Sequence, residues 1–328
     1  MLTLERCIKF VDAVDSIPQG FDFDTLYRLK LPNDPRSHGF MFPDIVERIP
    51  WTKDFVVFQD DKTVVLKAPS SSSASSPEDI ARYCTSAFDA VVKGMLPPPD
   101  DKDNQAKKLF PLLVNKESEP YLLAGTSPPV SLQRFSSPIF GVSSRGAHMT
   151  IYVRSPSSAG GIKIWVPTRS HKSFTYPGLL DTSVAGGVKA DHSPRRCVEE
   201  EALEEASLDV EATGLGGKIV DAGLITYVSK GKKYNTVTPT LLYCFDLEVD
   251  EGTVLEPNDS EVDKFELMTT EEVVDKMLDG KFKPNCCLVM MDFFMRHGIV
   301  MTDEEVNRGV RERMSRKLPV PIRPDDGW

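Results

Sequence analysis

The chain has 328 residues, 40% of them hydrophobic and 27% charged, and its formal net charge is −10. This composition fits one large or two ordinary folded domains and excludes a largely disordered chain. The negative charge disfavours non-specific binding to nucleic acid or anionic membranes, because both attract basic surfaces, so an anionic substrate would need a cation to reach an acidic site.

The first third of the chain is predicted to contain two helices and a pair of strands. Apolar spacing predicts one helix over residues 4–14 and another over residues 80–95. The runs DFVVFQD and KTVVLKA predict two strands joined by a turn. Residues 68–79 are rich in Ser and residues 96–105 contain a Pro run, and both are predicted to be loops because such sequences bury little apolar area.

From about residue 138 the pattern changes to alternating strands and helices. A helix is predicted over residues 194–207, because Ser193 can cap its first amides and Pro194 suits the first helical position. A later helix starts near Thr270. The other predicted elements are strands at AHMTIYVR, IKIWVPTR, KIVDAGLITYV, PTLLYCFDLEV and KFELM, and an apolar helix at NCCLVMMDFFMRHG. This order predicts a mixed sheet flanked by helices.

The helix predicted over residues 194–207 concentrates negative charge on one face. Glu201, Glu204 and Glu205 follow the spacing i, i+3, i+4, which brings their side chains together. Like charges at this spacing repel one another and destabilise an isolated helix. Two interpretations are open: a solvated face of an acidic protein, or a set of ligands for a hard divalent cation such as Mg²⁺ or Mn²⁺.

A pair of glycines before this helix favours the second interpretation. Gly186 and Gly187 follow a strand-like segment, and glycines permit tight turns and a close approach of the backbone to a ligand. A glycine pair, a short loop and a helix with the pattern E-x-x-E-E are together more specific than any one of them. The combination indicates metal-assisted attack on a phosphate or diphosphate.

With these features the sequence resembles the Nudix hydrolases. Their box reads G-x5-E-x7-R-E-U-x-E-E-x-G-U, where U is a bulky apolar residue, and its first glycine corresponds to Gly186. The resemblance implies that Glu201, Glu204 and Glu205 are the metal-binding carboxylates. Ala202 occupies an apolar position of the box and is small for it.

Three further positions depart from the box. His192 stands where the box has its first Glu, Glu200 where it has Arg, and Ser207 where it has its last Gly. In the family the Arg pairs with and orients carboxylates, so Glu200 adds negative charge where a cation is expected. Arg195 and Arg196 are candidates for compensating this charge. The departures motivate an alternative, a Nudix-fold binding module without turnover.

The surrounding sequence is similar to a narrower group, the thiamin pyrophosphokinase-related Nudix proteins of fungi and plants. The similarity rests on SSPIFGVSSRGAHMTIYVR, WVPTRSHKSFTYPGLLDTSVAGG, PNDSEVDKFELM and FKPNCCLVMMDFFMRHG. It implies an α/β fold of the α+β type, with a Nudix α/β/α sandwich and mixed sheet over residues 131–300. It also implies an N-terminal α+β accessory domain over residues 1–130 and a C-terminal tail over residues 301–328.

The same resemblance implies a reaction. Members of this group hydrolyse the diphosphate of thiamin diphosphate, or of its oxidised or damaged analogues, to the monophosphate. We therefore expect a hydrolase acting on acid anhydrides, with Mg²⁺ as cofactor and Mn²⁺ as a possible substitute. PGLLDTSVAGG also resembles isopentenyl-diphosphate isomerase-like Nudix proteins, which use a Cys, but no Cys lies between residues 138 and 196.

The resemblance adds candidate residues outside the glutamate helix. Glu261 stands in a loop where Nudix enzymes often supply another carboxylate, although it also fits an acidic surface turn. Arg169 and Lys172 fit either phosphate contacts or surface charge, and Tyr176 fits either packing or stacking on a ring. The predicted site comprises Glu204, Glu205 and Glu261 as catalytic residues, Glu201, Glu204 and Glu205 as metal ligands, and Arg169, Lys172, Gly186 and Gly187 as substrate-binding residues.

The remaining expectations concern compartment and partners. The six cysteines form no C-x-x-C pattern and suggest neither a zinc site nor a disulfide framework, which fits reduced thiols. The start of the chain lacks a signal-peptide pattern, and no apolar run approaches the ~18 residues of a membrane span. We expect a cytoplasmic protein that binds a small-molecule diphosphate and neither nucleic acid nor membrane. Its oligomeric state is left open.

Overall fold

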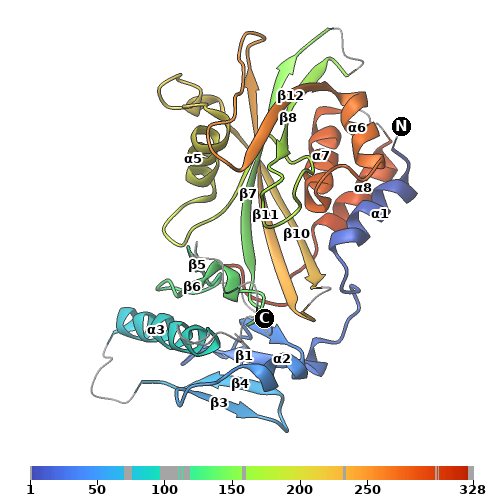
Figure 1. Cartoon of the computed structure of the whole chain (residues 1–328). Coiled ribbons are helices and arrows are strands. Elements are labelled where there is room, and N and C mark those ends of the chain that lie inside the picture. Colours follow the sequence, from blue (N-terminus) through green and yellow to red (C-terminus); the bar gives the residue numbers. More distant parts are fainter. Residues whose placement is uncertain are drawn as a thin grey trace.

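The computed structural model describes residues 2–69, 76–96, 110, 113, 119–156, 160–231, 234–299, 301 and 303–323. The chain forms a six-stranded mixed sheet covered by helices on both faces, with a smaller four-stranded sheet beside it (Figure 1). The strands of the larger sheet are β7 (Ser144–Arg154), β8 (Ile162–Arg169), β9 (Val184–Gly187), β10 (Val220–Lys230), β11 (Val237–Val249) and β12 (Val262–Thr269). The predicted α/β fold with an α/β/α sandwich is confirmed.

Strand β7 is the centre of the larger sheet, whose order is β10-β11-β7-β8-β12. It pairs in parallel with β11, and its other edge is shared by two strands. Strand β9 pairs antiparallel with the start of β7, with Gly186 opposite Ala147, whereas β8 pairs with its end, with Ile164 opposite Tyr152. Because β8 diverges from β7, the segment with the glycine pair lies beside the first half of β7.

Helix α5 (Pro194–Ala206) covers one face of this sheet. Val198, Ala202 and Ala206 lie four residues apart on one side of the helix and are fully buried against β7 and β11. Two of these residues are alanines, so the helix axis can lie close to the sheet. The small side chain of Ala202, a departure from the family box, is therefore accommodated by close packing rather than by a cavity.

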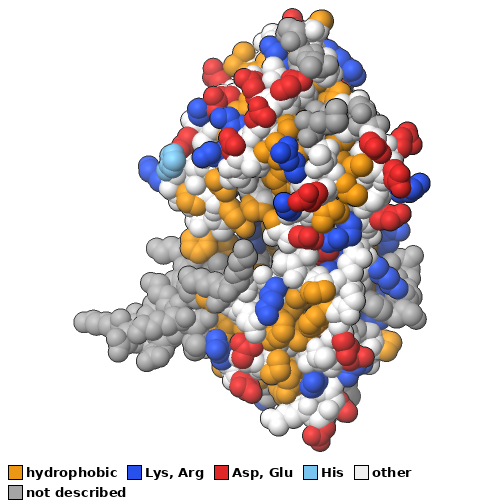
Figure 2. Space-filling model, turned by 90° about the vertical axis from the view of Figure 1, so that its right-hand side faces the viewer, with side chains coloured by type: hydrophobic (Ala, Val, Ile, Leu, Met, Phe, Trp, Pro, Cys, Tyr) orange, Lys and Arg blue, Asp and Glu red, His pale blue; other side chains and the backbone are white. Residues whose placement is uncertain are grey.

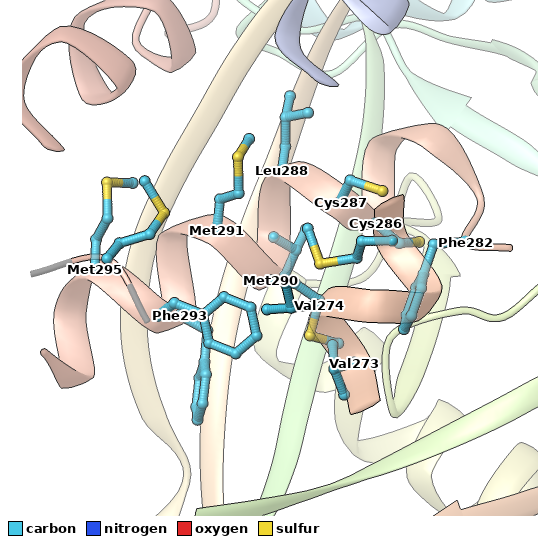
Figure 3. Packing of buried hydrophobic residues seen from close by; sticks show 14 of the residues in the cluster. Val273, Val274, Phe282, Cys286, Cys287, Leu288, Met290, Met291, Phe293 and Met295 are labelled. Carbon is cyan, nitrogen blue, oxygen red and sulfur yellow. The ribbon is translucent and has the colours of Figure 1, made fainter. Parts of the chain in front are cut away.

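The opposite face is covered by α6 (Thr270–Leu278) and α7 (Pro284–His297), together with α1 (Leu4–Val14) and α8 (Glu304–Met314). Helix α7 is buried along most of its length, as its apolar sequence predicts, and Figure 3 shows its side chains directed into the core beside those of α6. Leu288, Met290 and Phe293 are each fully buried. The two helical layers complete the sandwich.

The smaller sheet has the order β2-β1-β4-β3. Its strands are β1 (Tyr27–Lys30), β2 (Gly39–Met41), β3 (Phe55–Phe58) and β4 (Thr63–Leu66), and it packs with α2 (Pro43–Arg48) and α3 (Pro77–Met95) in a separate core. The predicted strand pair is confirmed as β3 and β4, and the helices predicted over residues 4–14 and 80–95 are confirmed as α1 (Leu4–Val14) and α3. The greater part of the loops predicted at residues 68–79 and 96–105 lies outside the described residues, but the end of the first prediction is wrong, because Ser76 caps α3 and residues 77–79 form its first turn. A short hairpin, β5 (Pro120–Leu122) and β6 (Ser131–Gln133), lies between the two sheets (Figure 1).

Both ends of the described chain contribute to the core beneath α7. Val11 of α1 and Val310 of α8 are fully buried there, although α1 falls in the predicted accessory domain and α8 in the predicted tail. The boundaries at residues 130 and 300 stay predictions. Across the described ranges, no helix is both long and apolar enough to cross a membrane.

Candidate active site

The glutamate helix α5 is held at both ends by local contacts. At its start the Ser193 hydroxyl accepts a hydrogen bond from the Arg196 amide at 3.1 Å, as predicted. It ends because Ser207 adopts the left-handed conformation, with φ 54°. Glycine is favoured at this position, and an L-residue there costs about 1 kcal/mol. The departure at Ser207 therefore keeps the turn that the family box makes with Gly.

A cavity of about 370 Å³ lies between α5, β9 and the β5–β6 hairpin. Its lining residues are Glu119, Arg134, Phe135, Ala185, Gly186, Gly187, Lys189, Glu201, Glu204, Asp259 and Glu261. The lining thus contains five carboxylates and two cations. On the face of the molecule shown in Figure 2, by contrast, acidic and basic side chains are interspersed. The cavity brings together five of the residues predicted for the site, namely Gly186, Gly187, Glu201, Glu204 and Glu261.

The two glycines allow two different side chains to approach the backbone of β9. A Cβ atom on Gly186 would overlap the carboxylate of Glu201, and a Cβ atom on Gly187 would overlap the phenol of Tyr121. Neither glycine is needed for a left-handed backbone. The glycine pair therefore serves close approach, from α5 on one side and from the β5–β6 hairpin on the other.

Glu205 lies behind the cavity rather than in its lining. Its side chain is buried, and one carboxylate oxygen accepts a hydrogen bond from the Ala185 amide at 3.1 Å. Burial and the neighbouring Glu201 raise the pKa of Glu205 well above its ordinary value. Burial, followed by repulsion from Glu204 and Glu261, raises the pKa of Glu201 to about 7. The direction of both pKa shifts agrees with the excess of carboxylates over cations in the cavity lining.

The donor set fits a hard divalent cation. Carboxylate oxygens are the ligands that Mg²⁺ and Mn²⁺ prefer, and a cation beside Glu201, Glu204 and Glu205 would relieve the repulsion that raises the pKa of Glu201. Among the described residues, however, these three side chains are not a group whose ligand atoms all lie within 4.8 Å of one another.

Another set of potential metal ligands lies closer together. The potential ligand atoms of His148, Asp181 and Cys286, all buried, lie within 4.8 Å of one another. Asp181 is already paired with Arg169 at 2.9 Å and Lys283 at 3.2 Å, and it accepts a hydrogen bond from the Cys286 thiol at 2.7 Å. Two protein cations thus balance this carboxylate. The glutamates of α5 are therefore the better candidate for a metal site.

The structure does not bring the predicted Arg169 and Lys172 to the cavity. The Arg169 guanidinium pairs with Asp181 and also donates to the Thr175 carbonyl at 3.2 Å. Lys172 lies exposed on the following loop, and neither residue lines the cavity. Tyr176, on the same loop, is 47% exposed. The surface interpretation fits Lys172, and Arg169 belongs to a buried ion pair that the sequence did not indicate.

Four charged residues of the lining were missed from the sequence: Glu119, Arg134, Lys189 and Asp259. Lys189 and Asp259 gave a weak signal, since each lies within three residues of a predicted site residue. Glu119 and Arg134 gave none, because the N-terminal half reaches the site only through the fold.

The two unexpected charges of the family box lie next to each other. His192 Nδ1 lies 3.2 Å from a carboxylate oxygen of Glu200, and the His192 side chain is 7% exposed. Glu200 also pairs with Arg196 at 2.9 Å and with Lys189 at 3.7 Å. The box places Glu at the first position and Arg at the second, so this chain carries a His at the first position and the carboxylate at the second. Arg196 and Lys189 thus compensate the negative charge of Glu200. Arg195, the other candidate for this role, pairs with Glu199 instead.

A double-mutant cycle tests this pair. His192→Glu alone brings a second carboxylate against Glu200 and is expected to destabilise the protein by about 1–2 kcal/mol. Adding Glu200→Arg is expected to recover about 1 kcal/mol of this loss, because a carboxylate and a guanidinium then face each other. Urea unfolding of the wild type, both single variants and the double variant measures the coupling. Additive effects of the two substitutions would contradict the pairing.

Known proteins match the region around this cavity. Residues 146–286 match the family model described as NUDIX domain. An uncharacterized protein of Saccharomyces cerevisiae is 33% identical over 202 residues, which are 59% of this chain and 59% of that protein. Nudix hydrolase 20, chloroplastic, of Arabidopsis thaliana is 30% identical over 240 residues, which are 70% of this chain and 60% of that protein. The matched part is therefore well short of the full length of either relative.

A solved structure is also similar. The NUDIX domain of NrtR from Shewanella oneidensis, complexed with ADP ribose, matches with a TM-score of 0.38 and 11% sequence identity. The match covers 48% of this chain and 90% of that chain.

Proposed function

We propose, taking residues 146–286 as a Nudix domain, that the chain is a divalent-metal-dependent hydrolase that cleaves a diphosphate bond. One observation carries the proposal. Two of the family's glutamates on α5, Glu201 and Glu204, and its glycine pair on β9 line one cavity, in which burial and then repulsion between carboxylates raise the pKa of Glu201. Such a cavity holds an anionic substrate only together with a cation, as metal-assisted hydrolysis requires.

The residues have distinct roles in this reaction. When bound by Glu201, Glu204 and Glu205, a divalent cation offsets charge on the phosphates and lowers the pKa of bound water. Glu204 and Glu261 line the cavity and are the candidate bases that accept a proton from the attacking water. The water oxygen bonds to phosphorus as the bridging P–O bond breaks, and two phosphate-containing products leave. Glu205 is held in place by the Ala185 amide and supports the helix position of the site.

The proposed substrate is thiamin diphosphate or one of its oxidised or damaged analogues, cut to the monophosphate. The sequence resemblance to the thiamin pyrophosphokinase-related group supports this choice. We further propose a cytoplasmic location and Mg²⁺ as the cation, with Mn²⁺ as a substitute.

Two alternatives are less well supported. An isomerase of the isopentenyl-diphosphate type needs a reactive Cys, but among the described residues no Cys lines the cavity. Cys197 of α5 is buried, and burial raises the pKa of its thiol to about 12. A binding module without turnover was motivated by Glu200 and Ser207, and both departures are accommodated by the structure.

A substrate screen tests the proposal. The purified full chain is incubated with Mg²⁺ or Mn²⁺ and with thiamin diphosphate, its oxidised analogues, ADP-ribose or isopentenyl diphosphate, and products are identified by mass spectrometry. We expect metal-dependent formation of a monophosphate, fastest with a thiamin-type diphosphate. Metal binding without any product would favour a binding module, and an isomerised diphosphate would favour the isomerase.

A further inference from the structure

The β5–β6 hairpin, which precedes the matched domain in sequence, is attached to the loop that follows the glycine pair. The Ala190 amide donates to the Pro120 carbonyl at 2.8 Å, and Tyr121 forms an isolated β-bridge with Lys189. The Tyr121 ring is buried, and its phenol lies against the backbone of Gly187. The hairpin is therefore fixed to one wall of the cavity through backbone contacts and a buried side chain.

This attachment places a cation in the same cavity as the carboxylates of α5. Arg134 lines the cavity with Glu201 and Glu204, and its guanidinium lies 5.5 Å from the centre of the Tyr121 ring. Its side chain is 44% exposed. Rings of this kind hold a guanidinium by cation–π attraction without using its hydrogen-bond donors. Arg134 is thus restrained in position while its donors can still meet a ligand.

Glu119 joins the two cations of the cavity. One of its carboxylate oxygens lies 3.6 Å from Arg134 Nη1, and the other lies 3.4 Å from Lys189 Nζ. Arg134 comes from the hairpin and Lys189 from the loop after β9, so this carboxylate links the N-terminal half to the matched domain. It also sets the distance between two positive groups at the cavity wall.

We propose that Arg134 binds a phosphate of the diphosphate substrate and that Glu119 positions the Arg134 guanidinium beside Lys189. This inference rests on the proposed function and assigns the N-terminal half a part in the same site. A guanidinium presents parallel N–H donors that match the oxygens of a phosphate. The carboxylates of α5 repel a phosphate, so a positive group in the same cavity is needed to bind it. The substrate class is a diphosphate ester, since the cavity is lined by a guanidinium that suits one phosphate and by carboxylates that, with a metal, suit the other.

A binding experiment separates this role from a structural one. The probe is methylenediphosphonate, a diphosphate analogue that is not hydrolysed, titrated by calorimetry in the presence of Mg²⁺. Arg134→Gln is expected to weaken its binding about 10- to 100-fold, the range for lost charge-assisted hydrogen bonds. Arg134→Lys keeps the charge but not the fork and is expected to weaken binding roughly 3- to 10-fold. Glu119→Gln is expected to weaken it less than Arg134→Gln.

The control variant is Arg154→Gln, an exposed Arg at the far end of β7 that pairs with Glu248. It should bind the diphosphonate as the wild type does. Binding of Mn²⁺ alone, followed by electron paramagnetic resonance, should be unchanged in all four variants, because none removes a carboxylate of α5. For a turned-over substrate, KM should rise more than kcat falls in Arg134→Gln.

The outcomes distinguish this inference from the hydrolase proposal. If the wild type binds metal and diphosphonate but turns over no diphosphate, the hydrolase proposal fails, and weaker binding in Arg134→Gln would still support the Arg134 assignment. If diphosphates are hydrolysed and Arg134→Gln binds the diphosphonate as tightly as the wild type, the Arg134 assignment is overturned alone. Should Arg134→Gln not fold, equal affinity in Arg134→Lys and the wild type would overturn it.

Discussion

Replacing Glu204 by Gln is expected to lower kcat for diphosphate hydrolysis by about 100-fold or more while leaving thermal stability nearly unchanged. Glu204 is exposed in the cavity and accepts no hydrogen bond from the described backbone, so Gln fits without leaving a buried group unpaired. The substitution removes a metal-ligating charge and a candidate base together. Steady-state turnover with Mg²⁺, alongside thermal denaturation, measures both effects.

Glu199→Gln is the matched control for this prediction. Glu199 lies on the same helix but pairs with Arg195 and lies outside the cavity lining. Its substitution is expected to leave kcat within about two-fold of the wild type, because a partly exposed ion pair contributes little. Equal turnover in the wild type and Glu204→Gln would remove Glu204 from the site. A similar loss in both variants would show that net charge, rather than position, governs the rate.

Glu205→Gln should differ from Glu204→Gln in one respect. The buried Glu205 carboxylate accepts the Ala185 amide, and the amide group of Gln would bring two N–H donors into the same space. We therefore expect a loss of turnover accompanied by a loss of stability. The contrast follows from burial, which the box pattern alone does not indicate.

Much of the fold could be predicted because its signals are local. The start of α5 at Pro194 follows from the cap and the proline, and the burial of α7 follows from its apolar sequence. The three glutamates share one side of α5 because helical spacing requires it. The separate fates of Glu204, exposed in the cavity, and Glu205, buried behind it, depend on the sheet beneath the helix and were not predictable from spacing.

The rest of the site depends on contacts between distant segments. Arg134 and Glu201 are far apart in sequence and meet only because the β5–β6 hairpin docks on the loop after β9. Arg169 was a candidate phosphate ligand, but its buried partner Asp181 is reached only after the chain folds back through an intervening loop. His192 and Glu200 are separate departures from the box in the sequence, and only the structure shows that their side chains contact each other.

In the absence of divalent metal, Glu201→Gln is expected to gain about 2 kcal/mol of stability relative to the wild type as the pH rises from 5 to 8. The pKa of Glu201 is about 7 in the folded protein, against an ordinary value of 4.5. The sign follows from this order: below pH 4.5 the carboxyl is protonated in both states, and as the pH rises through 7 the folded protein must ionise a buried group. Stability is therefore lost with rising pH, and Gln removes the part of this loss that Glu201 causes.

The comparison with the variant is needed because other groups titrate over part of the same range. Burial lowers the pKa of His148 to about 4. Through His148 the protein therefore loses stability as the pH falls, which is opposite in sign to the effect of Glu201. The contribution of His148 is the same in both proteins and cancels in the difference, whereas Glu205, whose pKa the neighbouring Glu201 helps to raise, adds to the stability that the variant gains. Urea unfolding at pH 5, 6.5 and 8 with a chelator present measures that difference. A difference in stability that stays constant from pH 5 to 8 would show that the pKa of Glu201 is not raised.

Divalent metal should reverse this loss in the wild type. Metal ligands must be deprotonated, so Mg²⁺ or Mn²⁺ should raise the melting temperature more at pH 8 than at pH 5, and less in Glu201→Gln than in the wild type. A cation held at His148, Asp181 and Cys286 would instead stabilise Glu201→Gln as much as the wild type. Because the two groups of potential ligands share no residue, this one comparison decides which of them holds the metal.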